Sequence, residues 1–507
     1  MKIAVVVQRY GQAINGGAEL HARYVAEHLA RHGDVEVLTT CATDYVTWRN
    51  ELEAGVEKVN GVPVRRFPVK HERDPDLFGR RSSRVFEQTH SLGDELDWLD
   101  AEGPTSPALV DYVATHAADY DYCLFFSYRY YHAYHGARAA GARAILVPTA
   151  ERDAAVGLAI FRPLFRSVRA LMYNSPEERA MIHAVSGNQD VPGLVVGIGS
   201  AVPQNVQPER FRQKFNVRGP FAVYVGRIDQ NKGCSELFEF FQGYLENPSH
   251  MLSLVLVGNS LLDIPKHPRI RHLGFLDDSD KFDAMAAADV LIMPSYFESY
   301  LQDPQGKLSL VLIGNSLLPI PQHPRIRHLG FLNDTDKFDA MAAAELLFTP
   351  SYYESLSMVA LEAWALGRPV LANGKCDVLK GQCIRSNAGL YYETFAEFIE
   401  TLWSIEHNRW LNSALGRNGR QFYREHYDWP VIERKYLDTF ERLKKEPPSR
   451  PSDPLPGWFD RRRQDVPAAE EVVARLPTGP ALTPPTGTAR TRPGTLPAHA
   501  DHARRRA

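Results

Sequence analysis

The chain has 507 residues, which is enough for two or three domains of ordinary size. Hydrophobic residues make up 44% of the sequence and charged residues 23%, a balance typical of globular proteins. The formal net charge of −3 gives no indication of a nucleic-acid partner or of a strongly anionic surface as a target.

Cysteine usage and hydropathy favour a cytoplasmic protein. None of the five cysteines forms a C-x-x-C pair, so neither a zinc site nor a disulfide framework is indicated. The opening run Met1–Val7 is too short for the apolar core of a signal peptide. No apolar run reaches the roughly 18 residues that a membrane span needs. We expect any membrane contact to be peripheral, at the inner face.

The first half of the chain alternates between strand and helix patterns. Ile3–Val7 is a continuous apolar run, Gly11–Gly17 a loop, Ala18–His32 a helical pattern and Val35–Thr39 the next apolar run. Further strands are predicted at Val64–Phe67, Tyr122–Phe126, Ala144–Val147, Ala170–Tyr173 and Leu194–Val196. Such alternation predicts an α/β domain with a mostly parallel sheet covered by helices on both faces.

A second series of the same kind follows a linker at Gly197–Gly219. It has a predicted strand at Phe221–Gly226, a helix at Ser235–Leu245 and a strand at Leu252–Val257. We therefore expect one Rossmann-like domain over residues 1–200 and a second over 201–420. From residue 446 to 507 the chain is rich in Pro, Arg, Thr and Ala, and we predict that this tail is disordered because it has few large apolar residues to bury.

Comparison of the chain with itself shows an internal duplication. Residues 241–296 and 297–352 align without gaps and are identical at 40 of 56 positions. Two copies are too few for a repeat array, so each is interpreted as a piece of one Rossmann-like domain. The substitutions are mostly conservative, which favours a real duplication or a chimeric gene over a copying error. We expect the second copy to lie beside strand Phe221–Gly226 and the first to be displaced.

Two glycine-containing turns follow predicted strands. Gly16-Gly17-Ala18-Glu19 lies between the first strand and first helix, where glycines let backbone N–H groups approach a phosphate. The segment from Gly226 to Gly233 carries Arg227 and Lys232, which can grip a diphosphate as a fork and as a point charge. The alternatives are an ordinary turn and two solvated cations.

Two carboxylates, Glu354 and Glu362, lie eight residues apart in a strand–loop–helix segment. Glu354 follows the predicted strand Leu346–Pro350, and the predicted helix Met358–Leu366 carries Glu362. The start of that helix points at the crevice beyond the strand ends. One carboxylate can bond sugar hydroxyls and the other a ribose. A carboxylate pair also suggests a hydrolase, but this helix is too apolar for a broad sugar groove.

An aromatic and histidine cluster follows strand Tyr122–Phe126. It runs from Tyr128 to His135 and includes His132. Aromatic rings stack on sugars, so Tyr128 and His132 are candidate sugar or acceptor contacts. Packing at the start of a helix explains the cluster equally well.

The combination of Gly-Gly-Ala-Glu, Gly-Arg-Ile-Asp-x-x-Lys-Gly and Glu-x7-Glu resembles glycosyltransferase family 4 over roughly residues 1–440. The resemblance implies the GT-B fold, with two facing Rossmann-like domains and a cleft between them, and an N-terminal domain on the acceptor side. It implies retaining, metal-independent transfer from a nucleotide diphosphate sugar of the UDP or GDP type, with no other cofactor. The acceptor would be a glycan, a lipid-linked molecule or a small molecule.

The resemblance also assigns roles to residues. Arg227 and Lys232 would bind the diphosphate, with Gly16 and Gly17 approaching it from the first domain. Glu354 would bind the donor sugar and Glu362 the ribose. The remaining donor contacts would be Gly330, Leu332, Ser355 and Leu356. Helices between Phe422 and Leu443, within 421–445, would cross back over the first domain.

Two departures from the family pattern leave alternatives open. Many members carry a histidine where Glu151 stands here, so a sugar or acceptor contact by Glu151 is an expectation from position alone. The duplication inserts an extra unit between the Arg227–Lys232 turn and Glu354. The alternatives to an active transferase are a catalytically silent nucleotide-sugar-binding relative and another GT-B enzyme, such as a sugar-nucleotide epimerase or a phosphorylase.

Overall fold

The computed structural model describes residues 1–14, 16–200, 351–447 and 451–481. Between 201 and 350 it describes Gln213, residue 346 and seven strands. The predicted helix Ser235–Leu245 and both cations of the Arg227–Lys232 turn lie outside the described residues.

The N-terminal half forms an eight-stranded sheet in the order β3-β4-β2-β1-β5-β6-β7-β8. Its strands are β1 (Lys2–Val6), β2 (Asp34–Thr40), β3 (Gly55–Val59), β4 (Val62–Phe67), β5 (Tyr122–Phe126), β6 (Ala144–Val147), β7 (Ala170–Tyr173) and β8 (Gly193–Val195). Strand pairs are parallel except for β3–β4. The predicted strands are confirmed, with ends that differ by at most two residues.

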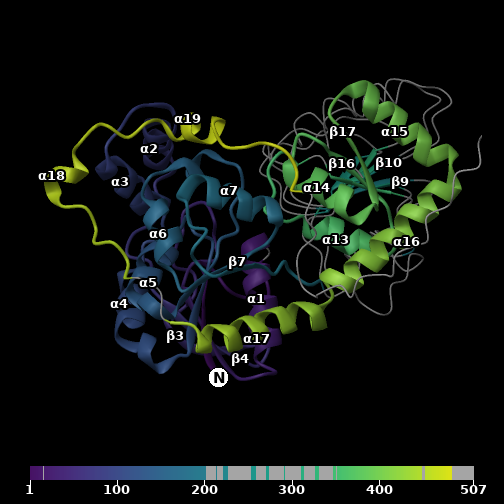
Figure 1. Cartoon of the computed structure of the whole chain (residues 1–507). Helices are drawn as coiled ribbons and strands as arrows, with labels where there is room; N and C mark the ends of the chain where they lie inside the picture. Colours follow the sequence, from purple (N-terminus) through teal and green to yellow (C-terminus); the bar gives the residue numbers. More distant parts are fainter. Residues whose placement is uncertain are drawn as a thin grey trace, which may run out of the picture.

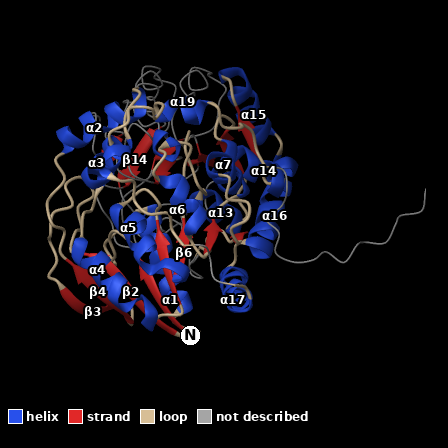
Figure 2. Ribbon diagram, turned by 60° about the vertical axis from the view of Figure 1, so that its left-hand side comes forward, coloured by secondary structure: helices blue, strands red, loops and turns tan. Residues whose placement is uncertain are grey.

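Helices cover this sheet on both faces (Figure 2). They are α1 (Gly17–Leu29), α2 (Pro75–Glu87), α3 (Leu92–Glu102), α4 (Pro107–His116), α5 (Tyr131–Ala140), α6 (Phe161–Ser167) and α7 (Pro176–Ser186), with short 3-10 turns η1 (Ala117–Asp119), η2 (Gly141–Arg143) and η3 (Ala154–Gly157). The central strands β5 and β6 are buried at every position, as expected of parallel strands covered on both sides.

The C-terminal half contains a nine-stranded sheet. Its strands are β9 (Phe221–Val225), β10 (Ser253–Val257), β11 (Ile270–His272), β12 (Val290–Leu291), β13 (Leu310–Leu312), β14 (Ile326–Gly330), β15 (Leu347–Thr349), β16 (Val370–Asn373) and β17 (Gly389–Tyr392). The order is β13-β14-β10-β9-β12-β15-β16-β17, and β11 also pairs with β10. The described helices of this half are α13 (Met358–Ala365), α14 (Asp377–Ser386), α15 (Phe395–His407) and α16 (Arg409–His426).

The placement of the duplicated copies corrects our expectation. The first strand of copy one, β10, pairs with β9 over five residues, whereas the equivalent strand of copy two, β13, lies at the sheet edge. The last strands of the two copies, β12 and β15, lie side by side between β9 and β16. The expectation that copy two occupies the position beside β9 is wrong. The sheet contains strands of both copies, and the equivalent strands β11 of copy one and β14 of copy two both pair with β10.

The chain returns to the N-terminal domain through α17 (Trp429–Lys445). The ring of Trp429 stacks on His28 of α1, with centroids 3.7 Å apart and planes 11° apart. Glu433 accepts hydrogen bonds from His28 Nδ1 at 2.5 Å and from His32 Nε2 at 2.8 Å. This helix therefore fixes the end of the second domain on the first.

Residues 451–481 correct the prediction of a fully disordered tail. They cross the N-terminal domain through the short helices α18 (Trp458–Arg461) and α19 (Ala469–Ala474), drawn in yellow in Figure 1. Val466 forms an antiparallel bridge with His90, and Ala469 is fully buried in the core of that domain. Composition alone missed this because only a few apolar residues of the tail, Ala469 and Leu476 with Val472 and Val473, make the contact. Residues 482–507 lie outside the described part.

Candidate active site

The carboxyl ends of the parallel strands place several candidate residues along one edge of the N-terminal sheet. Gly16 and Gly17 lie in the connection after β1, Tyr128 and His132 follow β5, and Glu151 follows β6. Because these strands are parallel neighbours, their ends open onto the same edge, which is where open α/β sheets bind ligands.

The Gly-Gly turn is shaped by an internal ion pair. Gly16 caps α1, and a Cβ at this position would lie 2.0 Å from Glu19 Oε2. Glu19 is 5% exposed and accepts hydrogen bonds from Arg9 Nε at 2.8 Å and Arg9 Nη2 at 2.5 Å. A Cβ at Gly17 would meet nothing within 4 Å. Gly16 therefore makes room for Glu19, whereas Gly17 leaves the start of α1 open. The sequence pattern identified the two glycines but did not predict the ion pair between Glu19 and Arg9.

Tyr128 and His132 are deeply buried. Tyr128 is 2% exposed and makes an edge contact with Phe161, with centroids 4.8 Å apart. His132 is 0% exposed, its Nε2 lies 3.2 Å from the carbonyl of Phe126, and burial lowers its pKa to about 4. These contacts are those of packing side chains, so the role of Tyr128 and His132 as sugar contacts stays a prediction.

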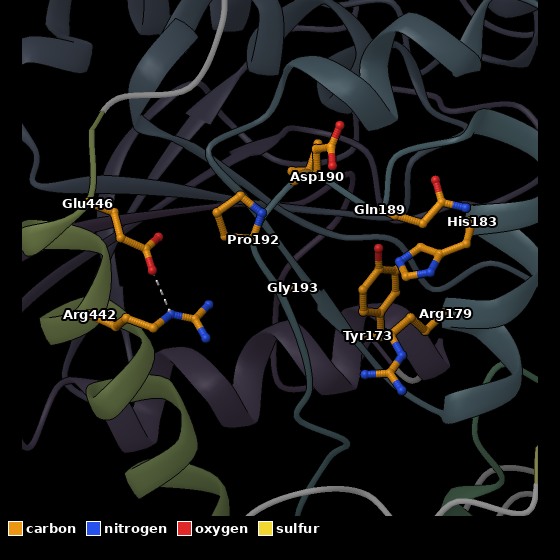
Figure 3. A pocket seen from close by; sticks show the side chains of 10 residues that line it. Tyr173, Arg179, His183, Gln189, Asp190, Pro192, Gly193, Arg442 and Glu446 are labelled. Atoms are coloured by element: carbon orange, nitrogen blue, oxygen red, sulfur yellow. Dashed lines mark ion pairs between the residues drawn. The ribbon is translucent and has the colours of Figure 1, made fainter.

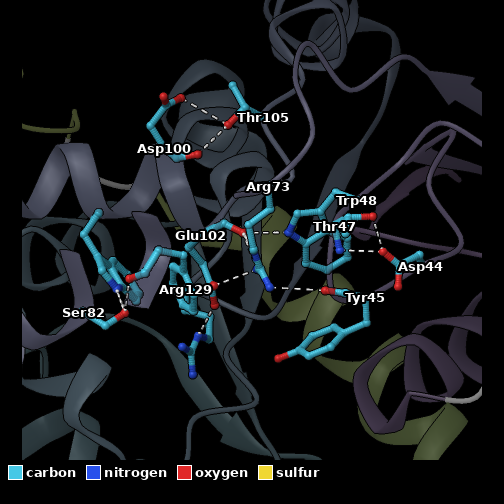
Figure 4. A network of polar contacts seen from close by, with 12 residues as sticks. Asp44, Tyr45, Thr47, Trp48, Arg73, Ser82, Asp100, Glu102, Thr105 and Arg129 are labelled. Carbon is cyan, nitrogen blue, oxygen red and sulfur yellow. Dashed lines mark hydrogen bonds and ion pairs between the residues drawn. The ribbon is translucent and has the colours of Figure 1, made fainter. Parts of the chain in front are cut away.

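The loop that carries Glu151 is held by a buried polar network (Figure 4). Glu102 is 1% exposed and accepts hydrogen bonds from Arg73 Nη2 and Arg129 Nε, both at 2.8 Å. Arg129 also donates to Asp153 Oδ2 at 2.6 Å, two residues beyond Glu151. The guanidinium group of Arg129 thus ties the β6 loop to Glu102 of α3.

Glu178 fixes the other end of that loop. Its carboxyl oxygens accept backbone N–H bonds from Ala150 and Asn174, each at 2.5 Å. Burial is the main cause that raises the pKa of Glu178 to about 8, and the charge of Glu151 contributes to the shift. Glu151 itself is partly exposed at this strand-end edge. Motif reading missed Glu178 because Ala150 and Asn174, whose backbone N–H groups bond to its carboxylate, belong to no motif.

In the second domain, Glu354 and Glu362 occupy the predicted loop and helix. The side chain of Ser357 caps α13 by accepting from Ala360 N at 3.4 Å. Glu354 is partly exposed in the loop before this cap, and Glu362 is 2% exposed on the helix. The strand and helix predicted around this pair are confirmed as β15 and α13.

Two hydrogen bonds join this segment to the N-terminal domain. Asn174, at the end of β7, donates from Nδ2 to Ser355 Oγ at 3.3 Å. Ser200 donates from its hydroxyl to Glu362 Oε1 at 3.2 Å. Leu356, between them, is 7% exposed. The candidate donor-binding segment therefore faces the strand ends of the first domain, and neither Asn174 nor Ser200 belongs to a motif that would have identified it.

The other candidate donor contacts come from the duplicated region. Gly330 is the last residue of β14, where it pairs with Val257 of β10. Leu332, like Arg227 and Lys232, lies outside the described residues.

A cavity of about 460 Å³ lies away from these residues, beside β8 and between α7 and α17 (Figure 3). It is lined by Tyr173, Arg179, His183, Gln189, Asp190, Val191, Pro192, Gly193, Arg442 and Glu446. It contains none of the candidate site residues.

The part of the chain that the structure describes holds neither a metal-binding cluster nor a membrane-spanning helix. No group of three or more His, Cys, Asp or Glu side chains there gathers to hold a metal ion. Within the same part of the chain, no helix has both the length and the apolar character for a bilayer crossing.

Comparisons with known proteins bear on the fold and the reaction class. Residues 205–300 and residues 300–404 each match a family model described as glycosyl transferases group 1. These matches support a glycosyltransferase. The first match contains copy one of the duplication, and the second begins near the start of copy two. Among curated proteins, none matches this sequence.

Solved structures show that this chain has the GT-B fold. Sucrose-phosphate synthase from Thermosynechococcus elongatus is similar with a TM-score of 0.53 and 16% identity, over 88% of this chain and 99% of the other. HepE from Anabaena in complex with UDP-glucose is similar with a TM-score of 0.51 and 16% identity, over 87% and 100%. An E. coli structure described as trehalose-6-phosphate bound with UDP-2-fluoro glucose has a TM-score of 0.50 and 12% identity, over 88% and 100%.

Proposed function

We propose that this chain is a retaining glycosyltransferase of family 4 that moves a hexose from a UDP or GDP sugar to a hydroxyl group. The acceptor is a glycan, a lipid-linked molecule or a small molecule at the cytoplasmic side. The observation that carries the proposal is the pair of cross-domain hydrogen bonds from Asn174 and Ser200 to the segment of Glu354 and Glu362. The UDP-glucose bound to the similar HepE structure supports a nucleotide-sugar donor.

In this proposal the donor lies between the two domains. Glu354 bonds the sugar hydroxyls, Glu362 the ribose, and the backbone N–H groups of Ser355 and Leu356 lie near the start of α13, where a helix favours an anion. Arg227 and Lys232 hold the diphosphate. Gly17, with open space around it, lets the start of α1 approach the same diphosphate.

The transfer step breaks the bond between the anomeric carbon and the diphosphate oxygen and forms a bond from that carbon to the acceptor oxygen. The acceptor proton passes to the leaving diphosphate. Negative charge grows on the diphosphate as the first bond breaks, so Arg227 and Lys232 stabilise the transition state more than the bound donor. No metal ion is needed for this step.

A second candidate function rests on the sheet order. β12 lies between β9 and β15, so the connection after β9, which leads to Arg227, is separated by one extra strand from the connection after β15, which leads to Glu354. Neighbouring strands lie about 4.8 Å apart, so the extra strand adds roughly 5 Å between the two half-sites. That displacement favours a nucleotide-sugar-binding protein with little or no turnover.

Binding and turnover measured on the same protein separate the two functions. A panel of UDP and GDP hexoses is titrated by calorimetry, and each donor that binds is then followed for hydrolysis and transfer. The transferase predicts both binding and Glu354-dependent turnover. Donor binding without turnover establishes the silent relative, and binding by none of the donors contradicts both.

A further inference from the structure

The segment after α17 contacts both domains. It leaves α17, runs across α3 and α2 on the N-terminal domain, and ends beside α14 of the second domain (Figure 1). The segment is closely packed where α19 meets η3, because a Cβ at Gly157 would lie 2.3 Å from the carbonyl oxygen of Ala469. We call its last part, residues 475–481, the C-terminal clasp.

The clasp first joins Arg152 to α14. Arg152, in the loop after β6, donates to the carbonyl groups of Leu476 and Pro477. Its guanidinium also lies 3.5 Å from Asp377 at the start of α14. The backbone N–H of Gly479 donates to the other carboxylate oxygen of Asp377 at 3.0 Å. Arg152 of the N-terminal domain and Asp377 of the second domain therefore each bond to the clasp, and they also form an ion pair with each other.

The last residue of the clasp bonds to a buried ion pair between the two domains. Glu177 of α7 and Arg385 of α14 form two hydrogen bonds, and their side chains are 5% and 1% exposed. Ala481 bonds to both partners: its N–H donates to Glu177 Oε1 at 3.0 Å, and its carbonyl accepts from Arg385 Nη1 at 2.5 Å.

A glycine on α14 makes this pair possible. A Cβ at Gly381 would lie 2.0 Å from Glu177 Oε1 and 2.6 Å from Arg385 Nη1. The carboxylate of α7 therefore reaches across α14 only where that helix has no side chain.

The pair is positioned to control the candidate site. Glu177 lies three residues after Asn174, whose side chain bonds to Ser355 next to Glu354. The start of α7 and the residues just before it therefore contact two parts of the second domain. Glu177 bonds to α14, and Asn174 bonds to the donor-binding segment. A buried ion pair adds little net stability but is costly to break, so it fixes one relative geometry of its two partners.

We infer that the C-terminal clasp, with the ion pair of Glu177 and Arg385, is a positioning device that sets the angle between the two domains. It holds the segment of Glu354 against the strand ends of the N-terminal domain. These residues touch no reacting group, and the part of the inference that concerns donor binding rests on the proposed function.

Two independent variants test this inference. The first removes residues 475–507, and its control removes only residues 482–507, which leaves the clasp in place. The second is Gly381→Ala, which displaces the Glu177 carboxylate. Its control is Gly79→Ala on α2, where a Cβ meets nothing within 4 Å. Both alanines favour their helices, so stability alone does not separate them.

The readouts are solution X-ray scattering, amide hydrogen exchange in α7 and α14, and donor kinetics. We expect both test variants to increase the radius of gyration, to speed exchange at least tenfold in these two helices, and to raise the donor KM at least threefold with a smaller change in kcat. Scattering and exchange that match the controls in either variant would overturn the inference. Because those two readouts need no donor, they decide it even if the proposed function fails.

Discussion

The hydroxyl of Ser200 donates a 3.2 Å hydrogen bond to the carboxylate of Glu362, and this contact links the end of the first domain to the helix of the candidate site. The carboxylate is 2% exposed, so a lost partner leaves a poorly solvated charge. The backbone carbonyl of Ser200 in turn accepts from Tyr423 Oη at 2.6 Å. Ser200 thus connects the linker, α13 and α16.

Ser200→Ala should therefore weaken both folding and donor binding. Removing a hydrogen bond to a buried charged group costs about 1–3 kcal/mol. We expect a loss of that size in the free energy of unfolding, measured with urea, and weaker nucleotide binding by calorimetry. Ser167→Ala is the control, because that half-buried hydroxyl bonds to the Leu164 carbonyl in its own helix. Equal effects of the two substitutions would show that Ser200 has no special role.

Arg227→Ala and Lys232→Ala should each weaken donor binding by about 1.5–3 kcal/mol, as expected for a lost charged hydrogen bond. The reason is that each cation faces the diphosphate in the proposed site. Lys58→Ala, on the exposed strand β3, serves as the control. Unchanged donor affinity in both test variants, measured by calorimetry, would remove the diphosphate assignment.

Lys435 should make stability depend on pH in the alkaline range. Its Nζ donates to the carbonyls of Val196 at 2.8 Å and His426 at 2.9 Å, and burial lowers its pKa from 10.5 to about 8. Between these values the unfolded chain binds more protons than the folded one, so this group's contribution to stability rises with pH from about 8 to 10.5 and is lost as pH falls toward 8.

The measurement compares the wild type with Lys435→Met in urea at several pH values. The difference in unfolding free energy should grow in favour of the wild type across that window. Comparing the two proteins cancels the titration of the tyrosines they share. Parallel stability curves would mean that Lys435 keeps an ordinary pKa in the folded protein.

Deleting the second copy should leave a working domain. Removal of residues 297–352 joins Tyr296 to Tyr353 and keeps Glu354 and Glu362. It also keeps β10 and β12, the observed neighbours of β9. We expect this protein to fold and to bind the donor at least as tightly as the full chain, because the extra strand between the half-sites is gone.

Deletion of residues 241–296 is the matched comparison. It also leaves a single copy, but it removes both neighbours of β9, so the strands of copy two must move to replace them. We expect a lower yield of folded protein and a lower Tm than for the first deletion. The reverse order would contradict the placement of the copies in the sheet.

The sequence was informative wherever a buried strand has a continuous apolar run. Tyr122–Phe126 and Ala144–Val147 were predicted with their observed ends because these strands are apolar and buried throughout. β3 was missed because four of its five residues are exposed and carry no alternating pattern. It is held instead by antiparallel pairing with β4.

Some residues of the candidate site could also be predicted from the sequence, whereas others could not. Glu354, Glu362 and the Gly-Gly turn stand out through spacing and the adjacent strands. Partners distant in the sequence, such as Asn174 with Ser355 and Glu177 with Arg385, leave no local pattern. The positions of the copies were also unpredictable, because β10 and β13 have nearly the same sequence and the choice between them depends on the rest of the sheet.

The central claim is sugar transfer from a nucleotide donor, and NMR of an early product tests it most directly. The wild type and Glu354→Gln are incubated with each donor that binds and a set of hydroxyl acceptors, with and without chelator. We predict a new glycoside with the anomeric configuration of the donor, formed at the same rate in chelator and at least a hundredfold more slowly by Glu354→Gln. An inverted product, dependence on added metal, or equal rates for the two proteins would contradict the account.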